Sequence, residues 1–459
     1  MARSALAPLS QPTKCSRFGR AWRLRAGGSL ITKQCRTPWP FRDRFVTRPS
    51  RNGQARREVY PVTTDDQEAC GHAHNGAGRQ AAARKEPTLV RRFGTMLLVA
   101  LAVAAVAAPA RAVGAFGPAV TVVDLGCASG DYSVAKASVN ADGVTRGWAV
   151  TVGASCGDDR IWYFQGAGGS WTRQRSPYRG VLMAAASDGT GAYLMYRASD
   201  GVHLAKRTPG GTFTAGRLLS DTTNRFIAGA VIATGGSWWA VWTEQTGQNR
   251  FGDPVYGLFQ AKTYGTDQAR QRITFSDDSD GQPDLALRPG GGAVLVWQRI
   301  TELPETGSIR VATSADGAWA SRAFTTGSDF GPYNQTPAVA TDSRWTYVTW
   351  ELDQHVFESD NRSGSFHSHR FVTPGSVPAI AASSGRTFVV WTTLARAGVP
   401  SHVFVAERSG GSWTGLNLPR TTPGYERAAE VTGHRGKATV LLFATGANGH
   451  DVVLARSQQ

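Results

Sequence analysis

The stretch TPAVATDSRWTYVTW, residues 336–350, decides the fold because close relatives of it recur along the chain. It predicts a strand of small residues, a polar turn over 341–344 and a second strand rich in aromatic residues. The same pattern is found at residues 227–242, 283–297 and 378–391. The chain is therefore expected to be built from a repeated pair of strands.

The last position of the second strand can be aligned in seven units. These positions are Thr151, Tyr196, Trp242, Trp297, Trp350, Trp391 and Phe443. They are spaced 41 to 55 residues apart, and no long stretch with a helical period lies between them. A unit of this length with four short strands is typical of a β-propeller. The pattern predicts an all-β fold, a seven-bladed β-propeller over residues 113–459.

Each unit continues with a glycine-rich turn followed by an aromatic residue, as in TSADGAW at residues 313–319. Glycine permits the positive φ of a tight hairpin, and the aromatic ring can pack between neighbouring blades. Ser314, Asp316, Gly317 and Trp319 resemble the Asp-box of sialidase-like (BNR-repeat) propellers, one residue shorter than that motif. The resemblance implies the propeller fold. The arginine triad and catalytic acid of sialidases match no position of this sequence.

The final unit ends after its third strand, at residues 451–456. Residues 119–125 precede the first unit and have no partner within it. We therefore expect this N-terminal strand to serve as the fourth strand of the last blade and to close the ring.

Residues 91–112 have the features of a secretory signal peptide. Two arginines precede the apolar run 96–108, and Ala110-Arg111-Ala112 resembles a cleavage site. The alternative is a buried core helix. Residues 1–90 are rich in arginine and lack apolar periodicity, which predicts a disordered segment or a translation start near Val90 or Met96. An arginine-rich targeting extension or a nucleic-acid-binding arm is the other interpretation.

The formal charge of +16 comes mostly from this leader. Residues 1–112 contain 20 of the 50 Lys and Arg and 6 of the 34 Asp and Glu, so 30 basic and 28 acidic residues remain. This balance argues against a nucleic-acid partner for the propeller. We expect a secreted, extracellular monomer without a membrane span in its mature part.

Cys127 and Cys156 are the two cysteines after the leader. An even pair in an exported protein predicts one disulfide, and the alternative is two free thiols. Cys127 follows the donated strand and Cys156 lies between the second and third strands of the first blade. Both positions are expected on one face of the disc, so the bridge could fasten the ring closure.

The loops between second and third strands vary in length on that same face and are longest at residues 244–254 and 299–308. Variable loops on a rigid scaffold are frequent binding sites. The candidate ligand-binding residues are Glu244, Arg299, Tyr333, Glu351 and Asp353. For any one of them, an ordinary solvated loop residue is the alternative.

A weak metal site is predicted in SDDSDGQPD, residues 276–284. Asp278, Asp280 and Asp284 around Gly281 resemble the calcium loop of FG-GAP propeller repeats. Oxygen ligands at alternate positions suit Ca²⁺. A plain acidic connection between blades is the alternative, and no other cofactor is indicated.

Two classes of function follow. The favoured one is a non-catalytic binding module for glycan or another surface polymer, because no complete catalytic set is visible. The alternative is a sialidase-like glycoside hydrolase that uses carboxylates of the loop face. Glu244 and Glu351 would be its first candidates, because a carboxylate pair is the minimum for glycoside hydrolysis.

Overall fold

The computed structural model of the protein describes residues 113–128, 132–152, 159–222, 228–265, 267–302, 305–324, 334–362, 366–393, 400–422 and 424–459. Every regular element within these ranges is a β-strand, which confirms the all-β class. No helix in these ranges is long and apolar enough to cross a membrane. The predicted leader, Cys156 and Tyr333 lie outside the described residues.

Four sheets each contain four consecutive antiparallel strands. The first two consist of β2 (Tyr132–Val139), β3 (Thr145–Val152), β4 (Arg160–Ala167), β5 (Ser170–Arg179), β6 (Val181–Asp188), β7 (Gly191–Ala198), β8 (Gly201–Arg207) and β9 (Arg217–Ser220). The next two consist of β10 (Gly229–Thr234), β11 (Ser237–Gln248), β12 (Pro254–Lys262), β13 (Gln268–Arg272), β14 (Ser279–Leu287), β15 (Ala293–Glu302), β16 (Glu305–Ser314) and β17 (Ala320–Ala323).

A seven-stranded sheet follows, in which one long strand belongs to two four-stranded runs. Its strands are β18 (Asn334–Thr341), β19 (Thr346–Leu352), β20 (His355–Asp360), β21 (His367–Ser383), β22 (Arg386–Thr393), β23 (Val403–Ser409) and β24 (Ser412–Asn417). The first part of β21 pairs with β20, and its second part pairs with β22.

The last sheet joins the two ends of the described chain. It contains β25 (Glu426–His434), β26 (Lys437–Thr445), β27 (His450–Ser457) and β1 (Val120–Ala128). β1 runs antiparallel to β27, with Val120 opposite Ala455 and Val123 opposite Val453. The N-terminal strand thus takes the fourth position of the last sheet, where residues 119–125 were expected.

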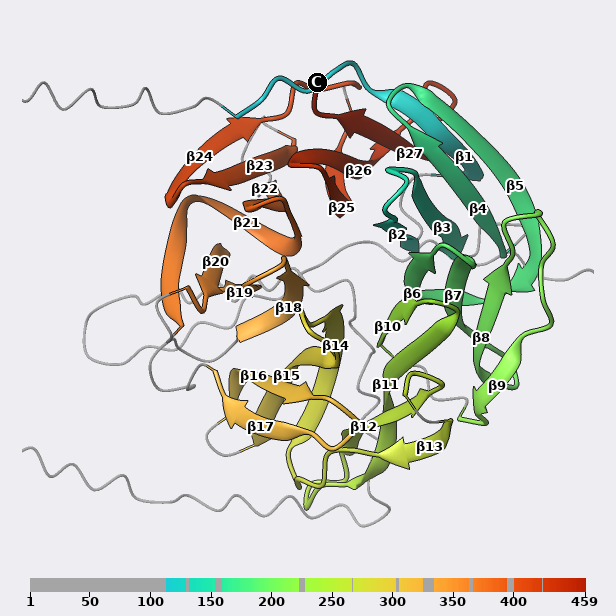
Figure 1. The fold of residues 1–459 in the computed structure, drawn as a ribbon, viewed down its shortest axis with the longest axis vertical. Coiled ribbons are helices and arrows are strands. Elements are labelled where there is room, and N and C mark those ends of the chain that lie inside the picture. Colours follow the sequence, from blue (N-terminus) through green and yellow to red (C-terminus); the bar gives the residue numbers. More distant parts are fainter. Residues whose placement is uncertain are drawn as a thin grey trace, which may run out of the picture. The chain divides into compact units, whose positions relative to one another are not determined.

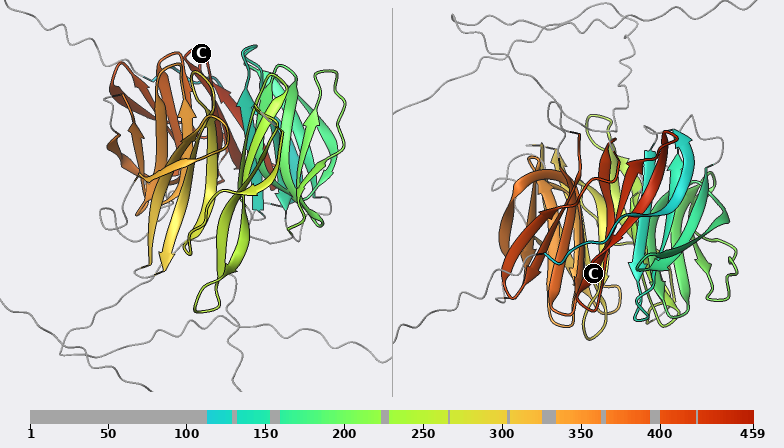
Figure 2. Two further views of the ribbon diagram at one scale, coloured as in Figure 1. Left: turned by 60° about the horizontal axis from the view of Figure 1, so that its bottom comes forward. Right: turned by 90° about the horizontal axis from the view of Figure 1, so that it is seen from above.

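The sheets follow one another in chain order around a common centre (Figure 1). The first strand of each four-stranded run contacts the first strand of the next, and β25 contacts β2. These strands lie innermost, and the fourth strands lie at the outside (Figure 1). Seen from the side, the sheets stand next to each other, and the hairpin of β11 and β12 extends beyond its neighbours (Figure 2).

The aligned ends of the second strands are all buried, as the repeat predicts. Trp242, Trp350 and Trp391 are 0% exposed, and Phe443 is 2% exposed. Both faces of a sheet are apolar because each face packs on a neighbouring sheet. In the sheet β14–β17, for example, Leu295 faces the preceding sheet and Val296 faces the following one.

The aromatic residues after the glycine-rich turns pack between sheets, as predicted. The Trp319 ring lies 5.0 Å from the Trp239 ring of the preceding sheet, and the Trp413 ring lies 4.9 Å from Phe371. Gly317 has a φ of +106° in the hairpin between β16 and β17. The Asp-box-like turn therefore occupies the hairpin between third and fourth strands.

Two expected loops are instead ladders of paired strands. β11 and β12 pair out to Gln248 and Pro254, and β15 and β16 pair out to Glu302 and Glu305. Pairing satisfies the backbone N–H and C=O groups that a loop would leave to water. Within the described residues, segments 244–254 and 299–308 are thus mainly paired strands.

Candidate functional site

The structure places the predicted ligand-binding residues in contrasting surroundings. Glu244 and Glu351 are only 2% and 6% exposed, whereas Asp353 is exposed in the turn between β19 and β20. Asp353 and Gln354 have φ values of +48° and +62°, which makes this turn tight. Glu244 and Glu351 are therefore buried side chains, whereas Asp353 is an exposed residue of a turn.

Glu244 is the centre of a polar cluster in the sheet β10–β13. Its Oε1 accepts hydrogen bonds from Trp242 Nε1 at 2.6 Å and from Arg270 Nε at 3.0 Å. Arg270 Nη2 donates to the other carboxylate oxygen. Residues two apart in a strand share a face, which places Trp242 and Glu244 together, while Arg270 reaches them from β13. The buried carboxylate is thus paired with an arginine that is 45% exposed.

Asp280 forms a second cluster of the same type in the sheet β14–β17. Trp297 Nε1 donates to its Oδ1 at 2.8 Å, and Arg299 donates from Nε at 2.7 Å and from Nη2 at 2.9 Å. Asp280 lies directly opposite Arg299 in the ladder of β14 and β15. Burial lowers the pKa of Arg299, but its hydrogen bonds to Asp280 and the charges of Asp280 and Asp278 together outweigh this effect, so the pKa of its guanidinium lies above the usual value.

Glu351 connects two runs of strands. Its Oε2 accepts a hydrogen bond from the backbone N–H of Val377 at 3.1 Å. Burial raises the pKa of Glu351, and hydrogen bonds from Val377, Gln335 and Thr336 oppose that rise. Glu244 and Glu351 lie in β11 and β19, and each has its own set of partners. No contact described by the structure joins them into an acid and base pair.

The three aspartates of the calcium candidate have separate partners. Asp280 binds Trp297 and Arg299, and Ser276 Oγ donates to Asp278 at 3.0 Å. Asp284 accepts from the Val339 N–H at 2.7 Å. Among the described residues, no group of three or more His, Cys, Asp or Glu side chains is arranged to hold a metal ion.

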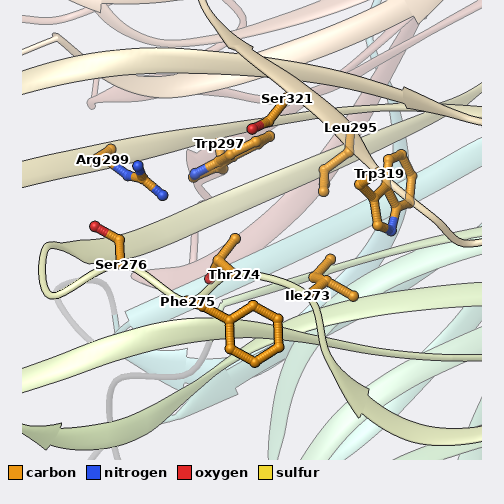
Figure 3. Close-up of a pocket in the computed structure, with 9 residues that line it drawn as sticks. All are labelled: Ile273, Thr274, Phe275, Ser276, Leu295, Trp297, Arg299, Trp319 and Ser321. Atoms are coloured by element: carbon orange, nitrogen blue, oxygen red, sulfur yellow. The ribbon is translucent and has the colours of Figure 1, made fainter.

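A pocket of about 380 Å³ lies between the sheets β10–β13 and β14–β17. One wall is the segment that follows β13, and the other is the face of β15 together with the start of β17 (Figure 3). The pocket is lined by Ile273, Thr274, Phe275, Ser276, Leu295, Trp297, Arg299, Trp319 and Ser321. Arg299 and Ser276 lie at one end and Trp319 at the other (Figure 3).

The pocket combines aromatic rings with hydroxyl groups and one guanidinium. Phe275 is 78% exposed, while Trp297 is 1% exposed and forms part of the floor. Arg272 lies over the Phe275 ring at 5.2 Å and thereby supports it. Of the predicted ligand-binding residues that the structure describes, the pocket contains only Arg299. Phe275 and Trp319 were not predicted to line a pocket, because no sequence motif marks an exposed aromatic residue in a connection between sheets.

The structure also reveals a repeated strained position near the centre of the ring. Gln282, Thr336 and Val377 have φ values of +50°, +49° and +52°, and each precedes a proline within a β-bulge. Thr336 N–H donates to Gln282 Oε1 at 2.6 Å, so neighbouring bulges support one another. Bulges and strained residues are frequent at functional sites. The sequence signal was the repeated residue before proline, whose conformation is normally extended.

No protein-family model and no curated protein matches the sequence. Similar solved structures include an α-L-arabinanase of Penicillium chrysogenum complexed with arabinobiose, with 10% identity, a TM-score of 0.43, and coverage of 74% of this chain and 98% of that one. The endosialidase of phage phi92 has 9% identity, a TM-score of 0.44, and coverage of 75% and 69%. Polysaccharide lyase Uly1 has 11% identity, a TM-score of 0.43, and coverage of 69% and 88%. No residue role is carried over at these identities.

Proposed function

We propose that this chain is an exported, extracellular binding module for a glycan or another surface polymer. The observation that carries this proposal is the pocket between the sheets β10–β13 and β14–β17. Its volume of about 380 Å³ lies within the range of small-molecule sites and suits one or two sugar rings.

The chemistry of the pocket walls supports a sugar ligand. A sugar ring has an apolar face of C–H groups and an edge of hydroxyl groups. Phe275, 78% exposed, and Trp319 offer flat rings for the apolar face. Ser276, Ser321 and Arg299 offer hydrogen-bonding groups for the hydroxyls. An exposed phenylalanine beside a pocket costs solvation energy that such a ligand would offset.

The charges favour binding over hydrolysis. Glycoside hydrolysis needs two carboxyl groups beside the scissile bond. The nine described residues that line the pocket include no Asp or Glu. Asp280 contacts two of them, and its oxygens already accept hydrogen bonds from Trp297 and Arg299. Glu351 keeps a sialidase-like glycoside hydrolase as the second candidate, because a buried carboxyl with a raised pKa is suited to proton donation.

We infer that the scaffold is a seven-bladed propeller closed by β1. The seven-stranded sheet counts as two blades that share β21, and the pairing of β1 with β27 supports the closure. A chain without residues 1–112 should still fold under this proposal. Removing residues 113–128 as well should expose the edge of β27, and the melting temperature should fall sharply. Equal melting temperatures would contradict the closure.

The binding proposal is tested with two exposed phenylalanines. Phe275 lines the pocket, whereas Phe251, 65% exposed, lies at the tip of the β11–β12 hairpin. The full chain, Phe275→Ala and Phe251→Ala are compared on an array of immobilised polysaccharides. Phe275→Ala should bind about tenfold more weakly than the full chain, because it loses one aromatic contact. Phe251→Ala should bind like the full chain. Equal binding by both variants would overturn the site, and release of sugar from a bound polysaccharide would favour the hydrolase.

A further inference from the structure

Arg310 lies on the pocket face of β16 but has no partner among the described residues. It is directly opposite the pocket residue Trp297 in the ladder of β15 and β16. The pocket residue Ser321 is opposite Ala312, the next residue of β16 on that face. Opposite residues of an antiparallel ladder share a face. Arg310 therefore lies on the pocket face of β16, between the lining strands β15 and β17, although its side chain is not one of the nine lining residues.

The hydrogen-bonding capacity of Arg310 is unused. Its Nε is buried without an acceptor, and no hydrogen bond or ion pair of its guanidinium occurs within the described part of the chain. Arg299 on the same face differs, because two of its nitrogens donate hydrogen bonds to Asp280. A half-buried guanidinium without an acceptor is costly, since its lost hydration is not replaced.

Arg310 and Arg299 also repel each other. They are diagonal neighbours in the ladder, and such neighbours lie about 7 to 8 Å apart in antiparallel sheets. Desolvation and the charge of Arg299 lower the pKa of Arg310, and the opposing effects of Asp280 and Asp278 do not compensate. The carboxylate of Asp280 is already committed to Arg299 and Trp297. The pocket wall is thus short of negative charge at Arg310.

We propose that Arg310, with Arg299 beside it, binds an anionic group of the polymer in this pocket. The group would be a carboxylate, as in a polyuronate, or a sulfate ester. Both present oxygens that a guanidinium can contact in pairs, and both would supply the missing acceptor. This inference rests on the proposed function and narrows it to acidic polymers. Phe275 and Trp319 would then hold the sugar ring while Arg310 holds its charged substituent.

The test uses matched pairs of polymers with the full chain. Polygalacturonate is compared with its methyl-esterified form, and dextran sulfate is compared with dextran. Arg310→Gln is compared with Arg250→Gln, which removes the same charge from the exposed tip of the β11–β12 hairpin. Calorimetry should show a preference of the natural chain for one of the two acidic polymers. Arg310→Gln should weaken that binding by at least about tenfold, and Arg250→Gln should change it by less than about twofold.

The polymer that binds identifies the anion, a carboxylate or a sulfate. Unchanged binding by Arg310→Gln would overturn the inference, and so would an equal loss in Arg250→Gln. If only the neutral polymers bind, the binding function stands and the anionic site is wrong.

A thermal readout separates this site from the polymer proposal. Without any anion, Arg310→Gln and Arg310→Met should melt no lower than the natural chain, because they remove an unpaired charge. Inorganic sulfate should raise the melting temperature of the natural chain more than that of either variant. That difference would support the anion site even if no polymer binds. Lower stability of both variants without anion, or equal sulfate shifts, would overturn it.

Discussion

Four tryptophans occupy the same repeat position in neighbouring sheets but differ in the partner of the indole N–H. Trp242 and Trp297 donate to Glu244 and Asp280 at 2.6 and 2.8 Å. Trp350 and Trp391 are equally buried, yet their Nε1 atoms have no acceptor in the part of the chain that the structure describes. The repeat therefore determines where the indole ring packs. It does not determine the acceptor of the indole N–H, which differs from one repeat to the next.

The positions that supply the partner explain the difference. The second residue after each tryptophan is Glu244, Arg299, Leu352 or Thr393. Asp280 lies opposite Arg299, whereas Gly375 lies opposite Thr393. At these positions of the described residues, the carboxylate and arginine occur together in the sheets β10–β13 and β14–β17. A buried N–H without an acceptor costs about 1 to 3 kcal/mol. The sheets β10–β13 and β14–β17 are also those that form the pocket.

The largest expected effect comes from breaking the Asp280 cluster. Asp280→Ala removes the acceptor of Trp297 and leaves Arg299, 16% exposed, without its counter-charge. The free energy of unfolding should fall by about 3 to 5 kcal/mol, as expected when one member of a buried pair is removed. Urea denaturation measures the change. Asp277→Ala alters an exposed neighbour and should change stability by less than about 0.5 kcal/mol. Similar losses in both variants would show that the cluster contributes little.

A second test uses a buried carboxyl that lacks such a cluster. Glu358 is 1% exposed, neither of its oxygens has a hydrogen-bond partner among the described residues, and Arg408 Nη1 lies 3.6 Å away. Burial raises its pKa to about 8. The folded chain then keeps a proton that the unfolded chain loses above its ordinary pKa of 4.5, so stability should fall as pH rises from about 5 to 8.

Glu358→Gln removes this titration. Its stability relative to the natural chain should rise by about 2 to 4 kcal/mol between about pH 5 and 8. Denaturation curves at several pH values measure this difference. The exposed-site variant Asp277→Asn serves as the control. A difference that stays constant across this range would contradict the buried, uncompensated carboxyl.

A third test asks why the sheet of Trp391 has no carboxylate at the Asp280 position. A Cβ added to Gly375 would lie 1.9 Å from Trp391 Cδ1 and 2.6 Å from the Thr392 carbonyl oxygen. Gly375→Ala should therefore cost about 1 to 3 kcal/mol through overpacking. Gly281→Ala is the matched control, because its added Cβ meets no atom within 4 Å. A neutral Gly375→Ala would show that Trp391 can move without cost.

The smallest expected effect is the contribution of one indole hydrogen bond to the free energy of unfolding. Trp297→Phe and Trp391→Phe remove similar ring volume from buried positions, but only the first also removes a hydrogen bond to a carboxylate. Trp297→Phe should cost about 1 to 2 kcal/mol more than Trp391→Phe. Parallel urea denaturation of the two variants gives this difference. Equal costs would mean that the hydrogen bond to Asp280 adds nothing to stability.

The fold was predictable from the sequence because its signals are local and repeated. The tryptophans at the strand ends and the turns before Trp319 and Trp413 each lie within a few residues of the structure that they indicate. The role of β1 followed from counting strands, since the last unit lacked one.

The site was less predictable because its contacts depend on register. Asp280 and Arg299 are 19 residues apart in sequence and opposite in the ladder, so the aspartate resembled a calcium ligand. Glu351 was predicted as a ligand-binding residue of the loop face, but its side chain is buried. The exposure of Phe275 leaves no trace in the local sequence, and neither does the lack of a partner for Arg310 among the described residues.

The uninterrupted length of β21 affects how the protein unfolds. Its 17 residues run without interruption from the outer strand of one run to the inner strand of the next. Between the other described sheets, the last strand of one sheet ends before the first strand of the next begins. Two sheets can separate at such a boundary while each keeps its own strand pairing. The strands from β18 to β24 have no such boundary, so their backbone amides should exchange with solvent as one cooperative block. Unfolding would then begin at the boundaries between the other sheets.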